Sequence, residues 1–524
     1  MKTRLLATIV ASTFAVAALA HEEDAGKGQL GKVNFPNSCS PKVQEKVTRG
    51  VAMLHSFWWS AGQSAFQEIA AEDPNCVVAA WGFASILMYN PFVGAVPPKD
   101  VALAQGAIEK GRQMKASQRD RDYLEAVEAY WDDYANRNER QRALARSQAY
   151  EKLAAKYPKD DEAQIFNALY LIAIQQASDQ TYSSSLKAAA ILEKQFAKYP
   201  NHPGVAHYLI HAYDAPPIAQ KGLPSAKRYA SIAPAAPHAL HMPSHIFTRV
   251  GAWQESAATN RRSADVALKG NDNDDALHAT DYIVYAYLQL GRDGEARKTY
   301  EEAARIGPST PRFVGPYPLA AMPARLAVER GAWREAAQLQ PLQSKFPFTE
   351  AVTHQARAIG AARMGDAAAA KADVEQITQK RDALRAAKSD YWATEVEVMR
   401  LTAAAWVALA ENRADEALGL ARGAADLEDK NEKHPVTPGR ILPARELLGD
   451  MLMELKRPAE ALKEYELSQT REPNRFRGIY GAALAGEMSG DAKAARRHYT
   501  RLVQMAGKGE PRAELTLARA YLSQ

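Results

Sequence analysis

The feature that most constrains this sequence is a recurring unit with regular helix-stop signals. Gly251, Gly291 and Gly331 are each 40 residues apart, and Pro158 and Pro200 are 42 residues apart. Glycine and proline at these places are typical helix terminators, and the intervals hold two helices and two turns. Because one such hairpin cannot bury its own apolar face, hairpins repeated at this period are expected to stack into a solenoid. The sequence therefore predicts an all-α fold.

Turn glycines, small residues five positions later and closing prolines recur in phase along much of the chain. They are Gly251, Gly291, Gly365 and Gly490, Ala296 and Ala336, and Pro74, Pro158, Pro200 and Pro473. This pattern resembles the tetratricopeptide repeat over roughly residues 45–507, with interruptions around 85–116 and 214–224. The motifs HYLIH and HMPSHIF are also similar to exported bacterial proteins built from this repeat. The resemblance implies a right-handed superhelix of about ten to twelve hairpins, whose first helices line a concave groove.

Length and charge limit the remaining choices. The 524 residues exceed one ordinary core, and we expect an N-terminal array over 45–330 and a C-terminal array with a capping helix over 331–524. Lys and Arg total 66 against 61 Asp and Glu, so electrostatic capture of nucleic acid is not expected. No phosphate-binding loop or dinucleotide fingerprint occurs in the sequence, so no nucleotide cofactor is expected.

The first residues have the pattern of an export signal. Lys2 and Arg4 precede an apolar run, and Ala18 and Ala20 form a small-x-small cleavage site, which predicts a signal peptide over 1–20. We expect a periplasmic or secreted protein without a transmembrane segment after cleavage. Residues 21–44 would then form a flexible, polar segment. Cleavage would leave His21 at the N-terminus. An N-terminal histidine can chelate copper through its amine and imidazole, and the alternative is that the position of His21 is a coincidence.

Export makes the cysteine content informative. Cys39 and Cys76 are the two cysteines of the chain, and each precedes a predicted helix of neighbouring hairpins. Disulfides persist in oxidising compartments, so we expect these two residues to be bonded.

Histidines are concentrated in one part of the repeat array. Seven of the twelve lie within 77 residues: His202, His207, His211, His238, His241, His245 and His278. His207 and His211 are four residues apart, as are His241 and His245, and this spacing puts each pair on one helix face. Pro243 is compatible with a helix there if it falls in the first turn.

The repeat register places these side chains on one groove. Counted back from the turn glycine, His238, His241 and His245 hold the offsets that His278, Asp281 and Tyr285 hold in the next unit. The predicted metal ligands are His207, His211, His241 and His245, with His238, His278 and Asp281 as further ligands or as residues that orient them. Both a mononuclear site centred on His241 and His245 and a dinuclear site fit this spacing.

The ligand types favour copper or zinc, and non-haem iron would also suit imidazole with carboxylate. Without thiolates, a purely structural zinc site is less favoured, and an open coordination position would make the site catalytic. Tyr285, Arg325 and Arg249 are candidate substrate-binding residues because they lie at or near groove positions, and an arginine can hold a carboxylate.

Three functions are consistent with this pattern. The first is an exported solenoid with a metal centre in its groove, acting as a hydrolase or an oxidase. The second is a non-enzymatic scaffold whose groove binds a peptide or protein partner. The third is a metal carrier or sensor that holds the same ion reversibly. If the protein is a metal-dependent enzyme, the groove would also bind a small-molecule ligand.

Overall fold

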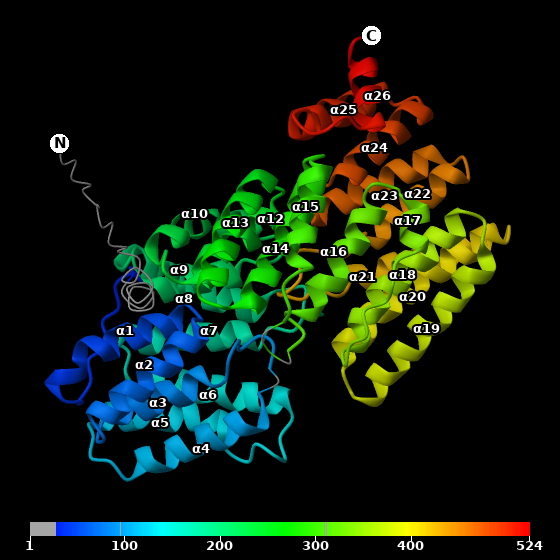
Figure 1. Ribbon diagram of the computed structural model, residues 1–524. Helices are drawn as coiled ribbons and strands as arrows, with labels where there is room; N and C mark the ends of the chain where they lie inside the picture. Colours follow the sequence, from blue (N-terminus) through cyan, green and yellow to red (C-terminus); the bar gives the residue numbers. More distant parts are fainter. Residues whose placement is uncertain (1–27, 95, 309, 311) are drawn as a thin grey trace, which may run out of the picture.

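The computed structural model describes residues 28–524 apart from 95, 309 and 311, and in this part of the chain it contains helices and loops but no strand (Figure 1). The predicted signal peptide over 1–20 and His21 lie outside the described residues. Within them, no helix combines the length and the hydropathy needed to cross a membrane.

The first half of the chain forms helices α1 to α12 and two short 3-10 helices, η1 and η2. Their bounds are η1 Pro41–Val43, α1 Gln44–His55, α2 Trp59–Glu72, α3 Val77–Ile86, α4 Pro98–Arg112, α5 Gln118–Trp131, α6 Glu139–Lys156, α7 Asp161–Ala173, α8 Ser183–Lys198, α9 Pro203–Ala212, η2 Ala219–Gly222, α10 Leu223–Ile232, α11 Pro237–His241 and α12 Pro243–Arg249.

The second half forms helices α13 to α26. Their bounds are α13 Trp253–Lys269, α14 Asn273–Gln289, α15 Asp293–Ala303, α16 Pro316–Val328, α17 Trp333–Ala337, α18 Pro347–Arg363, α19 Ala367–Ala386, α20 Asp390–Ala410, α21 Ala414–Asp429, α22 Ala444–Glu454, α23 Pro458–Arg471, α24 Phe476–Ser489, α25 Ala492–Ala506 and α26 Ala513–Leu522.

Successive helices pack in pairs, which confirms the predicted all-α solenoid of tetratricopeptide type. With α11 and α12 counted as one arm, α1 to α25 supply 24 arms, or twelve hairpins, and α26 closes the array. Gly251, Gly291 and Gly331 have φ of 69°, 68° and 64° in their turns. These left-handed conformations favour glycine, which explains why the turn residue recurs in the sequence.

The buried apolar side chains form a core that runs along the array. One large cluster extends from Leu30 to Phe247 and a second from Phe313 to Ala494. The domain boundary expected at 330–331 falls between α16 and α17, the two arms of one hairpin, and the second cluster passes across it. The division into two arrays at that position stays a prediction.

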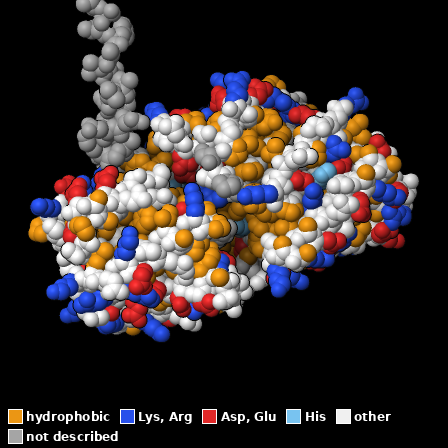
Figure 2. Space-filling view, turned by 60° about the horizontal axis from the view of Figure 1, so that its bottom comes forward, with side chains coloured by type: hydrophobic (Ala, Val, Ile, Leu, Met, Phe, Trp, Pro, Cys, Tyr) orange, Lys and Arg blue, Asp and Glu red, His pale blue; other side chains and the backbone are white. Residues whose placement is uncertain are grey.

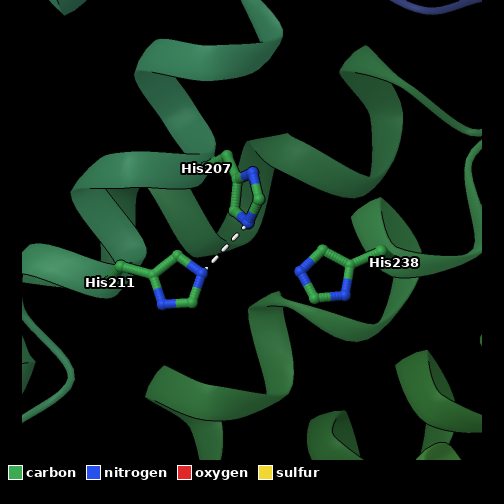
Figure 3. Close-up of side chains that lie close together, drawn as sticks. All are labelled: His207, His211 and His238. Carbon is green, nitrogen blue, oxygen red and sulfur yellow. Dashed lines mark hydrogen bonds between the residues drawn. The ribbon is translucent and has the colours of Figure 1, made fainter. Parts of the chain in front are cut away.

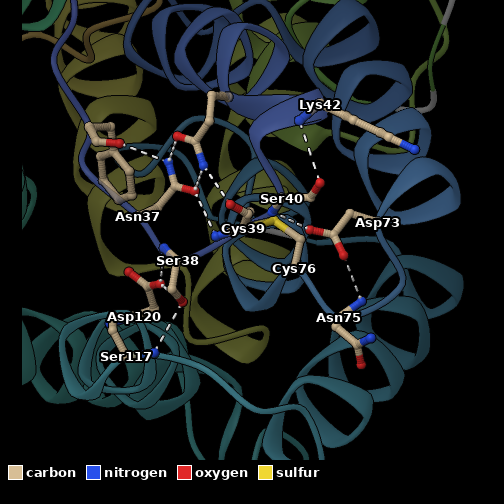
Figure 4. The surroundings of a disulfide bond; sticks show 12 residues. Asn37, Ser38, Cys39, Ser40, Lys42, Asp73, Asn75, Cys76, Ser117 and Asp120 are labelled. Atoms are coloured by element: carbon tan, nitrogen blue, oxygen red, sulfur yellow. Dashed lines mark hydrogen bonds between the residues drawn. A yellow bond between two sulfur atoms is a disulfide. The ribbon is translucent and has the colours of Figure 1, made fainter.

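The segment before α1 is packed, which corrects the expectation of a flexible segment over 21–44 for its described part. Phe35 stacks on Trp81 with ring centroids 4.9 Å apart, and the amide of Lys32 donates to the carbonyl of Asn201 at 3.0 Å. Cys39 and Cys76 form a disulfide that joins this segment to the start of α3 (Figure 4). Burial of an aromatic ring holds the segment in place where polarity alone predicted mobility.

The concave side of the solenoid is occupied by the chain itself. The loop between α21 and α22, residues 430–443, is called the inner segment below. Tyr282 of α14 donates to the carbonyl oxygens of Pro435 and Thr437 at 3.3 and 3.2 Å, and the amide of Glu432 donates to the carbonyl of Ala177 at 3.0 Å. The array also curves until α14 contacts α24. The groove predicted from the repeat is therefore largely filled.

Candidate metal centre

Six histidines from four helices meet behind the inner segment. His207, His211 and His238 form one triad, and His241, His245 and His278 form a second. Each histidine of a triad offers one ring nitrogen, and the three nitrogens lie within 4.8 Å of one another. Figure 3 shows the rings of His207 and His211 turned toward His238 across a common space. The rings of His211 and His245, one from each triad, have centroids 5.8 Å apart, so the triads adjoin.

The local sequence explains how the second triad is presented. Met242, between α11 and α12, has φ −54° and ψ −36°, so the helical path continues through it. Pro243 is the first residue of α12, where a missing amide hydrogen removes no helical hydrogen bond. His241 and His245 therefore keep their spacing on one face, and their Nε2 atoms lie 3.0 Å apart.

Hydrogen bonds on the far side of these two rings define their tautomers. His241 Nδ1 lies 2.7 Å from Asn260 Oδ1, and the Asn260 amide nitrogen donates to the Ser256 carbonyl at 2.8 Å. His245 Nδ1 lies 2.8 Å from a carboxylate oxygen of Asp214. Because both partner oxygens are acceptors, both Nδ1 atoms carry the hydrogen and both Nε2 atoms present lone pairs. Two lone pairs thus face each other at 3.0 Å.

The first triad is oriented in a similar way. His207 Nδ1 donates to the carbonyl of His55 at 2.7 Å, so its Nε2 presents a lone pair toward His211 Nε2, 3.1 Å away (Figure 3). His238 Nε2 and His278 Nδ1 are buried and make no hydrogen bond to any described residue. Buried polar atoms usually have a partner, so a bound ion would satisfy one nitrogen in each triad that no described residue satisfies.

Burial keeps the six rings neutral. Desolvation lowers the pKa of every imidazole of the two triads, and in five of them neighbouring imidazoles lower it further. For His245 the Asp214 carboxylate opposes the effect of burial. Neutral imidazole is the form that binds a metal ion, so the cluster is in its ligand form at neutral pH.

Aromatic side chains enclose the cluster. Phe92 lies 4.3 Å from His211 between ring centroids, Phe57 lies 4.5 Å from His207, and Tyr282 lies 4.8 Å from His241. This apolar wall excludes bulk water and lowers the local dielectric, which strengthens electrostatic interactions at the rings.

A charged network supports Asp214. Arg249 donates to Asp214 Oδ1 at 2.8 Å and to its carbonyl at 3.1 Å, and Glu432 of the inner segment lies 3.5 Å from Arg249. Lys433 Nζ is 3.7 Å from Asp214 Oδ2. Burial lowers the pKa of Lys433 to about 8, with Asp214 opposing the shift. Arg249, expected to bind substrate, thus has partners within the protein.

A pocket of about 420 Å³ leads from the surface to this network. His211, Asp214 and Lys433 lie on its wall together with Phe92, Tyr391 and Trp392. On the face shown in Figure 2, apolar side chains gather along a hollow between the two halves of the molecule, while acidic and basic side chains intermix over the outer surface.

Asp281, Arg325 and Tyr285 lie together but away from the triads. Arg325 donates to Asp281 Oδ1 at 3.0 Å and lies 4.8 Å above the Tyr285 ring. It also donates to the carbonyls of Gly439 and Arg440 at 2.6 and 2.9 Å. Asp281 belongs to neither group of converging ligand atoms. In this arrangement Arg325 anchors the inner segment, and a substrate-binding role for Arg325 and Tyr285 stays a prediction.

A third group of buried histidines has a different character. Glu162 lies 2.8 Å from His55 Nε2 and 2.9 Å from His202 Nε2, while His55 Nδ1 lies 2.9 Å from the Tyr208 hydroxyl. Burial alone would raise the pKa of Glu162, but the two imidazoles outweigh it and hold the pKa well below its usual range. Every ring nitrogen has a partner here, because the amide of Val205 donates to His202 Nδ1 at 3.3 Å. This group is satisfied without an ion.

Sequence reasoning missed several residues that orient the cluster. Asn260 and the His55 carbonyl fix ring tautomers, and Lys433 brings a charge from a distant loop. Asn260 lies one helix after His241, and its position facing that ring could have been found by aligning α13 with the second helix of other units. No sequence signal brings Lys433 to this place.

Comparison with protein families finds the repeat in one part of the chain. A family model described as a tetratricopeptide repeat matches residues 283–310, which include the C-terminal part of α14 and all of α15. Among solved structures, one similar chain belongs to the crystal structure of the APC/C hetero-tetramer Cut9-Hcn1, with 11% identity, a TM-score of 0.30, and coverage of 90% of this chain and 94% of that chain. No curated protein matches the chain.

The matched repeat is one of twelve hairpins of the same kind, and they continue on both sides of it. Arrays of this type generally bind protein or peptide partners. The chain is therefore an all-α helical solenoid of tetratricopeptide type, in which the family model matches residues 283–310.

Proposed function

We propose that this protein is a metal-dependent enzyme, a hydrolase or an oxidase, whose two histidine triads hold a pair of copper or zinc ions. The observation that carries the proposal is the contact between His241 Nε2 and His245 Nε2. Both rings are held as Nδ1–H tautomers, so their lone pairs meet at 3.0 Å without a proton between them. Two nitrogens bound to one tetrahedral zinc ion lie about 3.3 Å apart, so a shared cation would turn this repulsive contact into a favourable one.

The ligand chemistry supports the same proposal. Each triad offers three imidazoles and neither thiolate nor carboxylate, a set that suits copper or zinc better than iron. Three protein ligands leave a coordination position for water or substrate. A bound ion would supply Lewis-acid activation, and copper would add one-electron redox chemistry. Asp214 and Asn260 would keep His245 and His241 in the ligand tautomer.

The test is elemental analysis of the purified chain combined with ligand variants. We expect about two equivalents of copper or zinc per chain, and about one equivalent in His245→Ala and in His211→Ala, each of which disables one triad. His498→Ala is the matched control, because His498 lies on α25 and contacts Glu466 at the surface. It should keep the full metal content.

The outcomes separate the proposal from its alternatives. Absence of metal, together with no rise in melting temperature on adding copper or zinc, would contradict a metal centre. Bound metal that exchanges rapidly with a chelator, without turnover of ester, peptide or phenolic test substrates, would indicate a carrier. Metal-independent capture of a protein partner would favour a scaffold, which would have to use a surface other than the filled groove.

A further inference from the structure

The pocket beside the triads has the composition of a site for an organic anion. Phe92, Tyr391, Trp392 and His434 give it aromatic walls, and the His434 ring stacks on Trp392 with centroids 4.9 Å apart. The volume of about 420 Å³ falls within the range of small-molecule sites. Such sites combine an apolar lining with a few polar groups that fix the orientation of the ligand.

Lys433 is a polar residue of the pocket wall whose ammonium group has no hydrogen-bond partner among the described residues. Its side chain is 3% exposed, and Nζ makes no hydrogen bond. The nearest carboxylate oxygen, Asp214 Oδ2, is 3.7 Å away and is already bonded to His245. A buried ammonium group has three hydrogens to donate, and leaving them unsatisfied is costly. A carboxylate bound beside Nζ would supply an acceptor.

The charged groups around Lys433 form a mixed network. Asp214 and Glu432 lie beside Arg249, Arg471 and Lys433, and Arg471 is also 3.8 Å from Asp429. Glu472 acts on Lys433 and Arg249 as a further negative charge. The carboxylates balance the cations, so the feature that favours an anion in the pocket is the Lys433 ammonium group, which makes no hydrogen bond to a described residue.

We infer that this pocket binds a small organic carboxylate, with the carboxylate on Lys433 and an apolar or aromatic body between Phe92 and Trp392. His211 belongs to the first triad and lines the same pocket, so the ligand would lie beside the triad. That it is the substrate of the centre rests on the proposed function, whereas the binding itself rests on the pocket and Lys433. An inorganic anion would satisfy the ammonium but leave the aromatic walls without contacts.

Calorimetric titration with benzoate tests the inference, and it should be done on both chelator-treated and metal-loaded protein. We expect benzoate to bind the wild type in both states. Lys433→Met should weaken binding by at least about tenfold, because a charged hydrogen bond is lost. The matched control is Lys430→Met, since Lys430 is an exposed residue of the same inner segment. Its affinity should equal that of the wild type.

Neutral and inorganic probes identify what is recognised. Benzamide has nearly the shape of benzoate without its charge and should not bind measurably, and inorganic phosphate should bind more weakly than benzoate. Melting temperature and metal content of each variant report whether the fold is kept. If Lys433→Met does not fold, Lys433→Gln replaces it, with the same expectation of weaker binding.

Two results would overturn the inference. One is benzoate binding that is equal in the wild type and the Lys433 variants, or that appears solely with metal. The other is phosphate binding as tight as that of benzoate. Lys433-dependent binding in a chain that takes up neither copper nor zinc would leave this site standing and remove the proposed metal centre. Full metal content together with benzoate binding that does not depend on Lys433 would support the metal centre and contradict the carboxylate site.

Discussion

At the scale of single residues, Asp214 links most of the groups around the histidine centre. One of its oxygens accepts the Nδ1 hydrogen of His245 at 2.8 Å, and the other accepts a hydrogen bond from Arg249 at 2.8 Å. Burial alone would raise the pKa of Asp214, but Lys433, Arg249 and His245 hold it well below its usual value. The carboxylate is thus ionised and positioned to fix the tautomer of His245.

Asp214→Asn is expected to lower the metal affinity of the second triad by about 10- to 100-fold, the usual effect of losing a residue that orients a ligand. The amide carries no negative charge, and its nitrogen can face His245, so the lone pair at Nε2 is no longer enforced. Competition with a coloured chelator measures the affinity.

Asp415→Asn, an exposed carboxylate on α21, is the control and should have no effect. Equal affinities in wild type and Asp214→Asn would show that the carboxylate does not orient the ligand.

At the scale of elements, the segment before α1 is held by covalent and aromatic contacts. The disulfide joins Cys39 to Cys76, 37 residues later, and Asp73 accepts the amide hydrogen of Ser40 at 2.7 Å (Figure 4). These contacts connect the segment before α1 to the first two hairpins. The His55 carbonyl that orients His207 is at the end of α1, in the same part of the molecule.

Replacing both cysteines by serine is expected to lower the free energy of unfolding by about 4 kcal/mol, because the unfolded chain regains the entropy of a loop of this length. Thermal and urea denaturation of the double variant measure the change. Wild type treated with a reductant should match the double variant, because it lacks the same bond. A midpoint unchanged by either treatment would mean that the segment is held without the disulfide.

At the scale of the whole molecule, the inner segment connects the two halves of the solenoid. Arg325 binds it through two carbonyls and is also paired with Asp281, and the side chains of Arg325 and Asp281 are buried. Glu432 and Lys433 extend from the same segment to Arg249 and Asp214. The histidine centre is therefore enclosed by residues that are about 200 positions away in sequence.

Arg325→Met is expected to release the inner segment and to cost about 3–5 kcal/mol, because Asp281 is left as an unpaired buried charge. Lys433 and Arg440 would then become accessible to trypsin, and limited proteolysis followed by mass spectrometry would detect cleavage between α21 and α22. Arg334→Met, on the exposed side of α17, should leave the digestion pattern unchanged. Resistance of Arg325→Met equal to that of wild type would contradict this anchoring role.

Much of the fold and part of the centre could be predicted from local signals. Turn glycines such as Gly251 recur because their left-handed φ is needed at each hairpin, so the period is visible in the sequence. The pairs His207–His211 and His241–His245 share faces because helix geometry depends on spacing alone. The expectation that Asp281 lies with them was less successful. Asp281 lies on α14 with His278, but it pairs with Arg325 and belongs to neither triad.

The sequence by itself determined an all-α repeat array and the presence of paired histidines on neighbouring first helices, because both follow from contacts a few residues apart. The tertiary structure alone decided that the groove is filled by residues 430–443, that the histidines divide into two triads, and that Lys433 lies beside Asp214. Those features depend on how far the array curves and where a distant loop enters it, and these are set by summed packing along twelve hairpins that no local pattern encodes.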